Sequence, residues 1–403
     1  MTRPGIATDA VDGVIPKTVV EPSTPEEVGA MLELASRDTL SVAARGAGTK
    51  LGWGAPPRRV DMLLSTSRLN AVVAHRHGDL TATVQSGASL AAVNQQLAQH
   101  RQWIPLDPPF AERATIGGIV AANDSGPRRH RYGAPRDLII GVEFARADGQ
   151  LAKGGGIVVK NVAGYDLPRL MAGSFGSLSV IVTATFKLYP LTTASKTLVV
   201  DLKEPRDLGV LSAAIIGSHL TPTALEFETH PVRLLLRFES IPAGVDQQAA
   251  NAAALIASHG FSAQTVSGAE EDALWKQHEQ PVWNGTGAVV KVSLLPSALA
   301  GLLGTLNSQV GPANYVAAGR AGLAVFLVRI DGDTAAQARA IEAIRSTLHV
   351  GTGSAVIVRG SAELRAQTDV WGPIGDGLKV MRAVKRQFDP VGILNPGRGP
   401  GGI

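Results

Sequence analysis

Residues 159–190 read VKNVAGYDLPRLMAGSFGSLSVIVTATFKLYP, and we take this stretch as the one that decides the fold. A short loop of small residues, Gly173-Ser174-Phe175-Gly176, is followed by an apolar, β-branched run at residues 180–189. Such a run predicts a buried strand, which Pro190 would end. Two glycines three positions apart let backbone N–H groups approach a large anion without side chains in the way. We therefore expect a ligand-contacting loop that leads into a core strand.

The composition is that of a globular protein with more than one domain. At 403 residues the chain is long for a single hydrophobic core, so we expect two domains. Hydrophobic residues make up 45% and charged residues 18%, which is typical of soluble globular proteins. No run of 18 apolar residues predicts a membrane-spanning helix, and residues 1–10 lack the apolar core of a signal peptide. The expected location is the cytoplasm.

Charge and cysteine content exclude several kinds of site. The net charge is +4, and the basic residues are scattered apart from Arg128-Arg129-His130-Arg131. No aromatic stacking platform accompanies this cluster, which predicts a solvated loop rather than a nucleic-acid interface. The chain has no cysteine, which rules out a disulfide, a thiol nucleophile, a thiolate-bound iron–sulfur cluster and a cysteinyl flavin link.

A glycine-rich loop follows a strand predicted at residues 40–44. It reads Arg45-Gly46-Ala47-Gly48-Thr49-Lys50-Leu51-Gly52, and its G-x-G-x-x-x-G spacing is one residue longer than the Rossmann dinucleotide fingerprint. No Gly-Lys-Ser/Thr occurs in the chain, which excludes a P-loop. With no helix directly behind it, the loop could hold a pyrophosphate through backbone N–H groups and a hydroxyl. Taken alone, the pattern is equally that of a plain connecting loop.

A second region dense in small residues lies at residues 105–126. Prolines at residues 105, 108 and 109 precede Thr115-Ile116-Gly117-Gly118 and Asn123-Asp124-Ser125-Gly126. Small side chains at this density indicate a backbone that lies against a ligand or against another backbone.

Local signals predict the other elements of the first half. Thr24 would cap a helix, with Pro25 at its first position and Glu27 completing a capping box. Predicted strands lie at residues 60–64, 71–74, 81–85 and 138–145, and Ser89 would cap a second helix. His75 and His77 look like a metal-binding pair, but no third ligand lies near them in the sequence, which favours a solvated turn.

From about residue 191 the pattern changes to alternating strands and helices. Strands are predicted at residues 225–227, 234–238, 289–295 and 324–330, and helices at residues 246–258 and 334–348. This order predicts an α+β domain with an antiparallel sheet backed by helices. A helix at residues 378–388 then leads into a tail rich in proline and glycine. The expected domains are residues 1–190, residues 191–370, and a C-terminal helix and tail at residues 371–403 that packs on the first domain.

Together these stretches resemble the FAD-binding proteins of the vanillyl-alcohol-oxidase type, whose fold is also called PCMH. The resemblance covers about residues 22–190 and the terminal motifs Phe388-Asp389-Pro390 and Asn395-Pro396-Gly397. Within this family, residues 45–54 (RGAGTKLGWG) and 159–166 (VKNVAGYD) most resemble the FAD-binding subunits of bacterial glycolate oxidases. The resemblance implies an α+β fold, in which a PCMH-type domain of two α/β subdomains binds FAD and an α+β domain forms a cap.

The resemblance also implies which residues hold the FAD. The pyrophosphate would meet residues 45–50, the isoalloxazine and diphosphate would follow residues 115–118, and the adenine and ribose would lie near residues 173–176. Thr49 stands where relatives with histidyl-linked flavin carry a histidine, so non-covalent FAD is expected. The full set of expected cofactor-binding residues is Arg45, Gly46, Ala47, Gly48, Thr49, Lys50, Pro108, Thr115, Ile116, Gly117, Gly118, Asn123, Ser125, Gly126, Tyr132, Gly133, Asp137, Gly173, Ser174, Gly176, Ile181, Val182 and Asn395.

The hydroxy-acid site of the family is degraded in this sequence. Relatives that oxidise D-2-hydroxy acids carry a His-x-Gly-Asp-Gly-Asn element, a metal-binding histidine pair, and an Arg-Glu pair that holds the substrate carboxylate. The first two are absent here, and His278 stands where the arginine is expected. An imidazole that is mostly neutral at pH 7 does not replace a bidentate guanidinium. We therefore expect no catalytic residue and no metal in this chain.

The implied function is that of an FAD-binding subunit in a glycolate (2-hydroxy-acid) oxidase or dehydrogenase complex. As an FAD-dependent oxidoreductase acting on CH–OH groups, it would work beside a catalytic flavin subunit and an iron–sulfur subunit. These partners would bring a cytoplasmic chain to the inner face of the membrane. Two alternatives stay open: a stand-alone FAD oxidoreductase for another hydroxy acid or alcohol, and a structural subunit whose FAD does not turn over.

Overall fold

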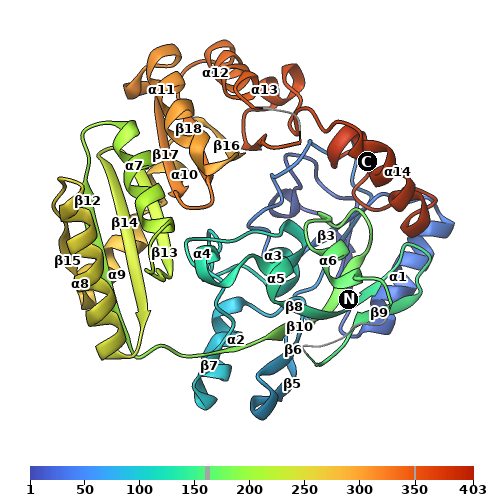
Figure 1. Ribbon diagram of the computed structural model, residues 1–403. Helices are drawn as coiled ribbons and strands as arrows, with labels where there is room; N and C mark the ends of the chain where they lie inside the picture. The colour runs from blue at the N-terminus through green and yellow to red at the C-terminus, as the bar shows by residue number, and fades with distance from the viewer. Residues whose placement is uncertain (159–163, 349–350) are drawn as a thin grey trace. The chain divides into compact units, whose positions relative to one another are not determined.

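The computed structural model describes residues 1–158, 164–348 and 351–403, and the chain divides into two compact units (Figure 1). Unit 1 comprises Met1–Gly126, Tyr132–Leu191 and Asp376–Ile403, and unit 2 comprises Pro127–Arg131 and Thr192–Gly375. The C-terminal stretch therefore belongs to the same unit as the N-terminal one. Residues 159–163 of the VKNVAGYD motif lie outside the described residues.

Unit 1 is built on two sheets. The first has the strand order β1-β2-β4-β3, in which β2, β4 and β3 run parallel. The second is antiparallel, with the order β5-β6-β10-β8-β9, and a short pair joins β7 to β11. The strands are β1 Thr2–Pro4, β2 Thr18–Val20, β3 Val42–Arg45, β4 Met62–Ser65, β5 Val72–Arg76, β6 Thr81–Gln85, β7 Gln102–Trp103, β8 Ile139–Ala145, β9 Leu151–Gly155, β10 Val180–Lys187 and β11 Tyr189–Pro190.

The core strand expected at residues 180–189 is confirmed. It forms β10, the central strand of the second sheet, and continues after one residue as β11. Every residue of β10 except Lys187 is buried, which explains why the sequence shows an unbroken apolar run instead of an alternating one. Because β10 lies between β6 and β8, it fixes the loop that precedes it against the centre of unit 1.

The helices of unit 1 begin largely where the caps predict. Thr24 Oγ1 accepts from the backbone N–H of Glu27 at 3.2 Å, and Ser89 Oγ accepts from Ala92 in the same way. The Glu27 carboxylate, however, bonds the backbone N–H of Ser23 and not that of Thr24, so the expected capping box closes one residue early. The helices are α1 Pro25–Arg37, α2 Leu90–Leu97, α3 Ile116–Ala122, α5 Pro135–Leu138, α6 Leu167–Met171 and α14 Gly377–Phe388, and α4 Arg129–Tyr132 lies at the unit boundary.

The C-terminal tail is fixed to unit 1 by a buried ammonium. Lys385 Nζ, at the end of α14, donates to the carbonyls of Ser177 at 2.7 Å and Leu394 at 2.8 Å, and to Asp389 at 2.6 Å. Leu394 forms a parallel bridge with Val42 at the start of β3. These bonds bring residues 393–395 beside the loop before β10.

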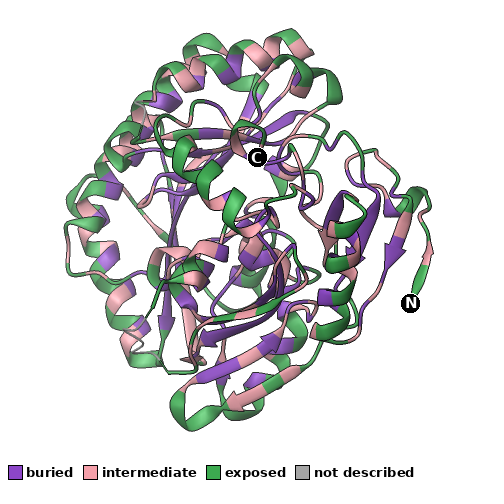
Figure 2. Cartoon of the chain, turned by 90° about the vertical axis from the view of Figure 1, so that its right-hand side faces the viewer, coloured by how far each residue is buried: buried purple, intermediate pink, exposed green. Residues whose placement is uncertain are grey.

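Unit 2 contains one antiparallel sheet of eight strands in the order β15-β12-β14-β13-β17-β18-β16-β19. In Figure 2 the strands are mostly buried and the outer sides of the helices are exposed. The strands are β12 Ala194–Asp201, β13 Ala224–Thr229, β14 Val232–Ser240, β15 Gln264–Val266, β16 Ala288–Ser293, β17 Tyr315–Arg320, β18 Val325–Ile330 and β19 Ser354–Arg359. The helices are α7 Pro205–Ile216, α8 Pro242–Ser258, α9 Gly268–Gln277, α10 Gln280–Trp283, α11 Leu299–Gln309, α12 Thr334–Ser346 and α13 Ala362–Gln367.

Candidate functional site

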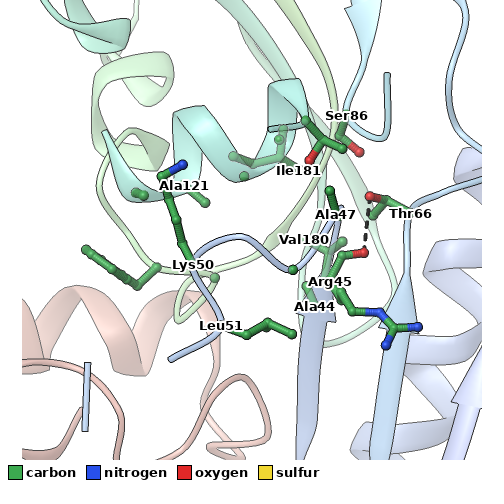
Figure 3. Close-up of a pocket in the computed structure, with 18 of the residues that line it drawn as sticks. Ala44, Arg45, Ala47, Lys50, Leu51, Thr66, Ser86, Ala121, Val180 and Ile181 are labelled. Atoms are coloured by element: carbon green, nitrogen blue, oxygen red, sulfur yellow. Dashed lines mark hydrogen bonds between the residues drawn. The ribbon is translucent and has the colours of Figure 1, made fainter. Parts of the chain in front are cut away.

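Four segments of unit 1 surround a cavity with about 880 Å³ of space that protein atoms do not fill. They are the loop after β3, helix α3 with Thr115 before it, the start of β10 with its preceding loop, and the C-terminal tail, and Thr66 and Ser86 complete the lining. Figure 3 shows the loop after β3 below α3, with the labelled residues Ala47, Ala121 and Ile181 among those that line the cavity. Glycine, alanine and hydroxyl-bearing residues make up most of this wall, so a flat ligand can approach the backbone closely. We call this space the main cavity.

The loop after β3 fits its surroundings only because two of its residues are glycines. A Cβ atom at Gly46 would overlap Thr115 Oγ1, so the loop backbone lies directly on the residue before α3. Gly48 has φ +77°, a left-handed conformation that a β-branched residue rarely adopts. This loop therefore presents backbone to the main cavity, which is what binding of a phosphate by N–H groups requires.

Two buried oxygens in the lining have no hydrogen-bond partner among the residues that the structure describes. They are Ser86 Oγ, directly after β6, and Asn395 Oδ1, in the tail. The amide nitrogen of Asn395 is used, since it donates to the carbonyl of Phe175 at 2.7 Å. A buried polar atom without a partner is uncommon in proteins, and a polar ligand in the main cavity would supply the missing bonds.

The main cavity contains one buried ammonium, that of Lys50. Its side chain is 8% exposed and lies 3.5 Å from Asp124 Oδ2, and Nζ is 5.7 Å from the centroid of the Trp53 ring. Figure 3 shows the Lys50 side chain extending toward Ala121 on α3. A cation at this position favours an anionic ligand, and Asp124 keeps that cation paired when no ligand is near.

The structure brings together about half of the residues that the sequence analysis selected. Those that line the main cavity are Arg45, Gly46, Ala47, Gly48, Thr49, Lys50, Thr115, Gly117, Gly118, Gly176, Ile181 and Asn395. The others lie outside its lining: Pro108, Ile116, Asn123, Ser125, Gly126, Tyr132, Gly133, Asp137, Gly173, Ser174 and Val182.

Several of these other residues cap or pack against the elements that carry the lining residues. Asn123 is the left-handed C-cap of α3, and its Oδ1 accepts from the backbone of Arg136 at 3.1 Å. Asp137 caps α5 through the N–H of Ala134. Tyr132 packs edge-on against Trp103 and Tyr189. These contacts hold α3 and the following turn in place.

The lining also contains residues that the sequence analysis missed. They are Ala44, Leu51, Trp53, Thr66, Ser86, Ala121, Ala122, Phe175, Ser179, Val180 and Arg398. Thr66 and Ser86 each come directly after a strand. Their position just beyond the predicted strands at residues 60–64 and 81–85 was the only sequence feature that could have indicated them. Arg398 follows no predicted strand, and nothing in the sequence indicated it. Its guanidinium donates to the carbonyls of Trp53 at 2.9 Å and of Leu51, over more than 340 positions of sequence.

In unit 2, His278 is enclosed between two glutamates of β13. It is 1% exposed, with Nδ1 at 2.7 Å from Glu228 Oε1 and Nε2 at 3.0 Å from Glu226 Oε2. Burial alone lowers the pKa of His278, but the hydrogen bonds and charges of both glutamates outweigh it and raise the pKa to about 9. The expectation of a mostly neutral imidazole at pH 7 is therefore wrong, because the sequence did not show that two carboxylates face one ring.

The guanidinium of Arg320 is likewise committed to contacts within unit 2. It is 3% exposed, donates to the carbonyl of Val325 at 2.8 Å, and lies 3.4 Å from Glu279 Oε1. Glu226, its neighbour across the β13–β17 pair, is 4.0 Å away. Among residues 1–158, 164–348 and 351–403 no group of three or more acidic or histidine side chains is arranged to hold a metal ion. His77 does stack on His100, with ring centroids 4.5 Å apart, a neighbour that the sequence did not reveal.

Comparison with protein families assigns a cofactor to unit 1. Residues 16–155 match the family model described as FAD binding domain, and residues 374–398 match the one described as FAD linked oxidases, C-terminal domain. The chain thus carries an FAD-binding domain, and FAD is its cofactor. The main cavity fits that molecule, because small residues and backbone can enclose a flat ring, Lys50 suits a diphosphate, and the unpartnered oxygens of Ser86 and Asn395 can bond polar edges.

Three curated relatives illustrate the range of the match. Glycolate oxidase subunit GlcD of Bacillus subtilis (strain 168) is 33% identical over 223 residues, which are 55% of this chain and 47% of GlcD. Glycolate oxidase subunit GlcE of Escherichia coli (strain K12) is 35% identical over 162 residues, 40% of this chain and 46% of GlcE. The chain spans about half the length of each. D-2-hydroxyglutarate dehydrogenase of Xanthomonas citri pv. viticola is 26% identical and covers 95% of this chain and 89% of its own.

The fold is also found among solved structures. One of alkyldihydroxyacetonephosphate synthase superposes with a TM-score of 0.71 at 18% identity, covering 95% of this chain and 77% of the other. The expected α+β fold of PCMH type is confirmed by this likeness and by the FAD binding domain match.

Proposed function

We propose that this chain is the FAD-binding subunit of a glycolate, or closely related 2-hydroxy-acid, dehydrogenase complex. The reaction is oxidation of a CH–OH group, with FAD held non-covalently and electrons passed on to partner subunits. The observation that carries this proposal is the main cavity, whose backbone loops, Lys50 and unpartnered oxygens suit a flavin nucleotide. The similarity of the matched half to GlcD and GlcE, both named as glycolate oxidase subunits, supports the substrate class.

In this proposal the residues of unit 1 bind and shield the cofactor. Bound FAD supplies a hydride acceptor for the carbon of a CH–OH group. The backbone of residues 46–48 holds the diphosphate, with Lys50 supplying positive charge. Ser86 and Asn395 bond polar edges of the flavin, and the alanines of α3 keep water from its rings. Thr49 has no ring nitrogen that could form a covalent flavin bond, so the FAD dissociates when the chain unfolds.

We propose that the chain depends on partners because the buried cations of unit 2, His278 and Arg320, are already paired with glutamates. A 2-hydroxy-acid dehydrogenase must hold a carboxylate and remove the hydroxyl proton. Arg320 and His278, which could anchor the carboxylate, are both buried and paired with glutamates. A buried charge that loses its partner costs several kcal/mol, about 3–5 when a pair is broken, so neither can readily turn to a substrate. A catalytic flavin subunit and an iron–sulfur subunit supply the missing steps.

The location follows from the partners rather than from a membrane segment of this chain. No helix in the part of the chain that the structure describes is long and apolar enough to cross a bilayer. We place the chain in the cytoplasm, brought to the inner membrane face by its partners.

One spectrum tests the cofactor, and one assay tests the complex. The purified chain should show flavin absorption bands, and acid precipitation should release all the flavin into the supernatant. Flavin that stays with the pellet would contradict non-covalent binding. Glycolate-dependent reduction of a dye acceptor should require this chain and the partner subunits together. Full activity of the partners without this chain would remove it from the reaction.

A second candidate is a stand-alone FAD oxidoreductase. The observation in its favour is the match to D-2-hydroxyglutarate dehydrogenase, which spans 95% of this chain rather than the matched half alone. Dye reduction by the isolated chain with D-2-hydroxyglutarate or another D-2-hydroxy acid would support this candidate over membership of a complex.

A further inference from the structure

The N-terminal segment, residues 2–14, precedes the region matched to the FAD binding domain, which begins at residue 16. It is nevertheless part of unit 1. β1 pairs with β2 over three residues, and Val11 is fully buried in a small core cluster with Val19, Ala43 and others. The segment is therefore held firmly enough to position a side chain.

That side chain is Asp9, a carboxylate that is 3% exposed. Its oxygens accept from Arg3 Nη1 at 2.6 Å and Nη2 at 2.9 Å, from the backbone N–H of Ile6 at 3.1 Å, and from Arg45 Nη1 at 3.0 Å. The hydrogen bond from Arg3 comes first among the causes that hold the pKa of Asp9 far below its usual range, and the bond from Arg45 adds to it. Asp9 is thus charged at any working pH and joins two guanidinium groups.

Arg45 connects this carboxylate to the main cavity. It is the last residue of β3 and directly precedes Gly46, the glycine that lies on Thr115. Figure 3 shows its guanidinium directed away from Lys50, while its carbonyl accepts from the Thr66 hydroxyl. The backbone N–H of Thr66 donates to the same carbonyl at 2.8 Å. Arg45 is therefore fixed at both ends, by Asp9 at the side chain and by Thr66 at the backbone.

The loop needs such an anchor because its other face is open. A second space of about 920 Å³ lies there, bordered by Arg45, Gly46 and Gly48 from the loop and by Thr8, Ala10 and Asp12 from the N-terminal segment. Protein atoms do not fill this space, so packing alone does not press residues 46–48 toward the main cavity. A charge-assisted bond at the start of the loop can do so.

We infer that Asp9 is a positioning residue for the cofactor: through Arg45 it holds the loop after β3 in the conformation that binds the FAD diphosphate. Asp9 need not touch FAD for this role. The inference rests on the FAD assignment and adds the N-terminal segment to the site. Without Asp9 the loop must be ordered when FAD binds, and that ordering weakens the affinity.

The test is FAD titration of the apoprotein, followed by quenching of flavin fluorescence. Asp9→Asn should raise the dissociation constant about 10- to 100-fold, the range expected for loss of a charge-assisted hydrogen bond. Asp9→Glu should recover part of the loss, since a carboxylate is retained. If Asp9 acts through Arg45, adding Asp9→Asn to Arg45→Gln should weaken FAD binding little further.

Asp61→Asn is the matched control. Asp61 is 4% exposed and bonds Lys17, Arg59 and Ser41, but it precedes β4 and so lies at the opposite end of the parallel strands from the loop. It should lower the thermal stability of the apoprotein as much as Asp9→Asn while leaving FAD affinity near that of the parent. Equal FAD affinity in Asp9→Asn and parent would overturn the inference, as would equal losses in both variants.

Two further outcomes, a parent that binds no FAD and a variant that does not fold, can be told apart from a failure of the inference. If the parent apoprotein itself binds no FAD, the cofactor assignment fails, not the role of Asp9. If Asp9→Asn does not fold, Asp9→Glu and Arg45→Lys carry the test, because both keep the charges but change the geometry. Parent-like affinity in both would then count against the inference.

Discussion

Gly48 is the residue whose backbone most directly limits what the loop after β3 can accept. Its φ of +77° is strained for any residue with a β-branched side chain. A Cβ atom there would itself lie only in ordinary contact with Leu51 and Arg45, so the expected effect is a change in the backbone of the loop. Gly48→Val should therefore abolish retention of FAD through purification, measured as the ratio of flavin to protein absorbance. Gly260→Val controls for strain, because Gly260 also has a positive φ, +83°, but lies in unit 2 with open space around it. Equal flavin content in the two variants would remove the loop from the site.

His278 should make stability depend on pH. Its pKa is about 9 in the folded chain and about 6.5 when unfolded, so the folded state favours the imidazolium. The contribution is complete below pH 6.5, where both states hold the proton, and is lost as the pH rises to 9. At about 1.4 kcal/mol per pKa unit it amounts to roughly 3 kcal/mol.

Urea unfolding at pH 6 and pH 9.5 tests this, with His278→Gln for comparison. The parent should lose roughly 3 kcal/mol more than the variant between the two pH values. The variant should be the less stable protein at pH 6, since it removes the imidazolium that lies between Glu226 and Glu228. An identical pH dependence of parent and variant would show that folding does not raise the pKa of His278.

At the scale of elements, the sequence predicted the strongly patterned ones and missed those shaped by distant contacts. β10 could be predicted because its own residues form an unbroken apolar, β-branched run, which is the local pattern of a buried strand. α3 was not predicted, although Ile116, Ile119 and Val120 recur at helical spacing and are buried. The helix has only seven residues, and its two adjacent glycines are poor helix formers. β12, β17 and β19 were missed as well, since strands within a wide sheet are selected by their neighbours as much as by local pattern.

The same division applies to the site. The residues found from sequence lie in glycine-rich motifs, whereas Thr66 and Ser86 are ordinary turn residues that matter because two strands end beside the loop. Asp9 and Arg398 lie far from the loop in sequence and reach it only through tertiary contacts. Such residues cannot be read from spacing in a single sequence.

α14 and the tail that follows it should depend on Lys385. Its ammonium is buried against Asp389 and two carbonyls, and Lys385→Met would leave that carboxylate buried without a cation. Breaking a buried pair in this way typically costs about 3–5 kcal/mol. The variant should unfold at lower urea and bind FAD more weakly, since Asn395 lies on the released tail. Lys379→Met, on the same helix but exposed, is the control; equal stability of the two variants would contradict the anchoring role.

At the scale of the whole molecule, the proposed cofactor site lies in unit 1, whereas the buried cations His278 and Arg320 lie in unit 2. The main cavity is lined by residues of unit 1 alone. Both of these cations are paired with glutamates. General-base assistance is worth about 10²–10⁴-fold in rate, and an Arg–carboxylate bond about 1.5–3 kcal/mol. On our proposal that the partner subunits supply both, the isolated chain should turn over several orders of magnitude more slowly than the complete complex.

Anaerobic mixing of the isolated, FAD-loaded chain with millimolar glycolate or D-lactate tests that claim most directly, with the flavin absorbance followed over time. We predict that the spectrum stays oxidised, and that it bleaches only after the catalytic partner subunits are added. Fast and complete bleaching of the isolated chain would contradict the account and identify a self-sufficient dehydrogenase.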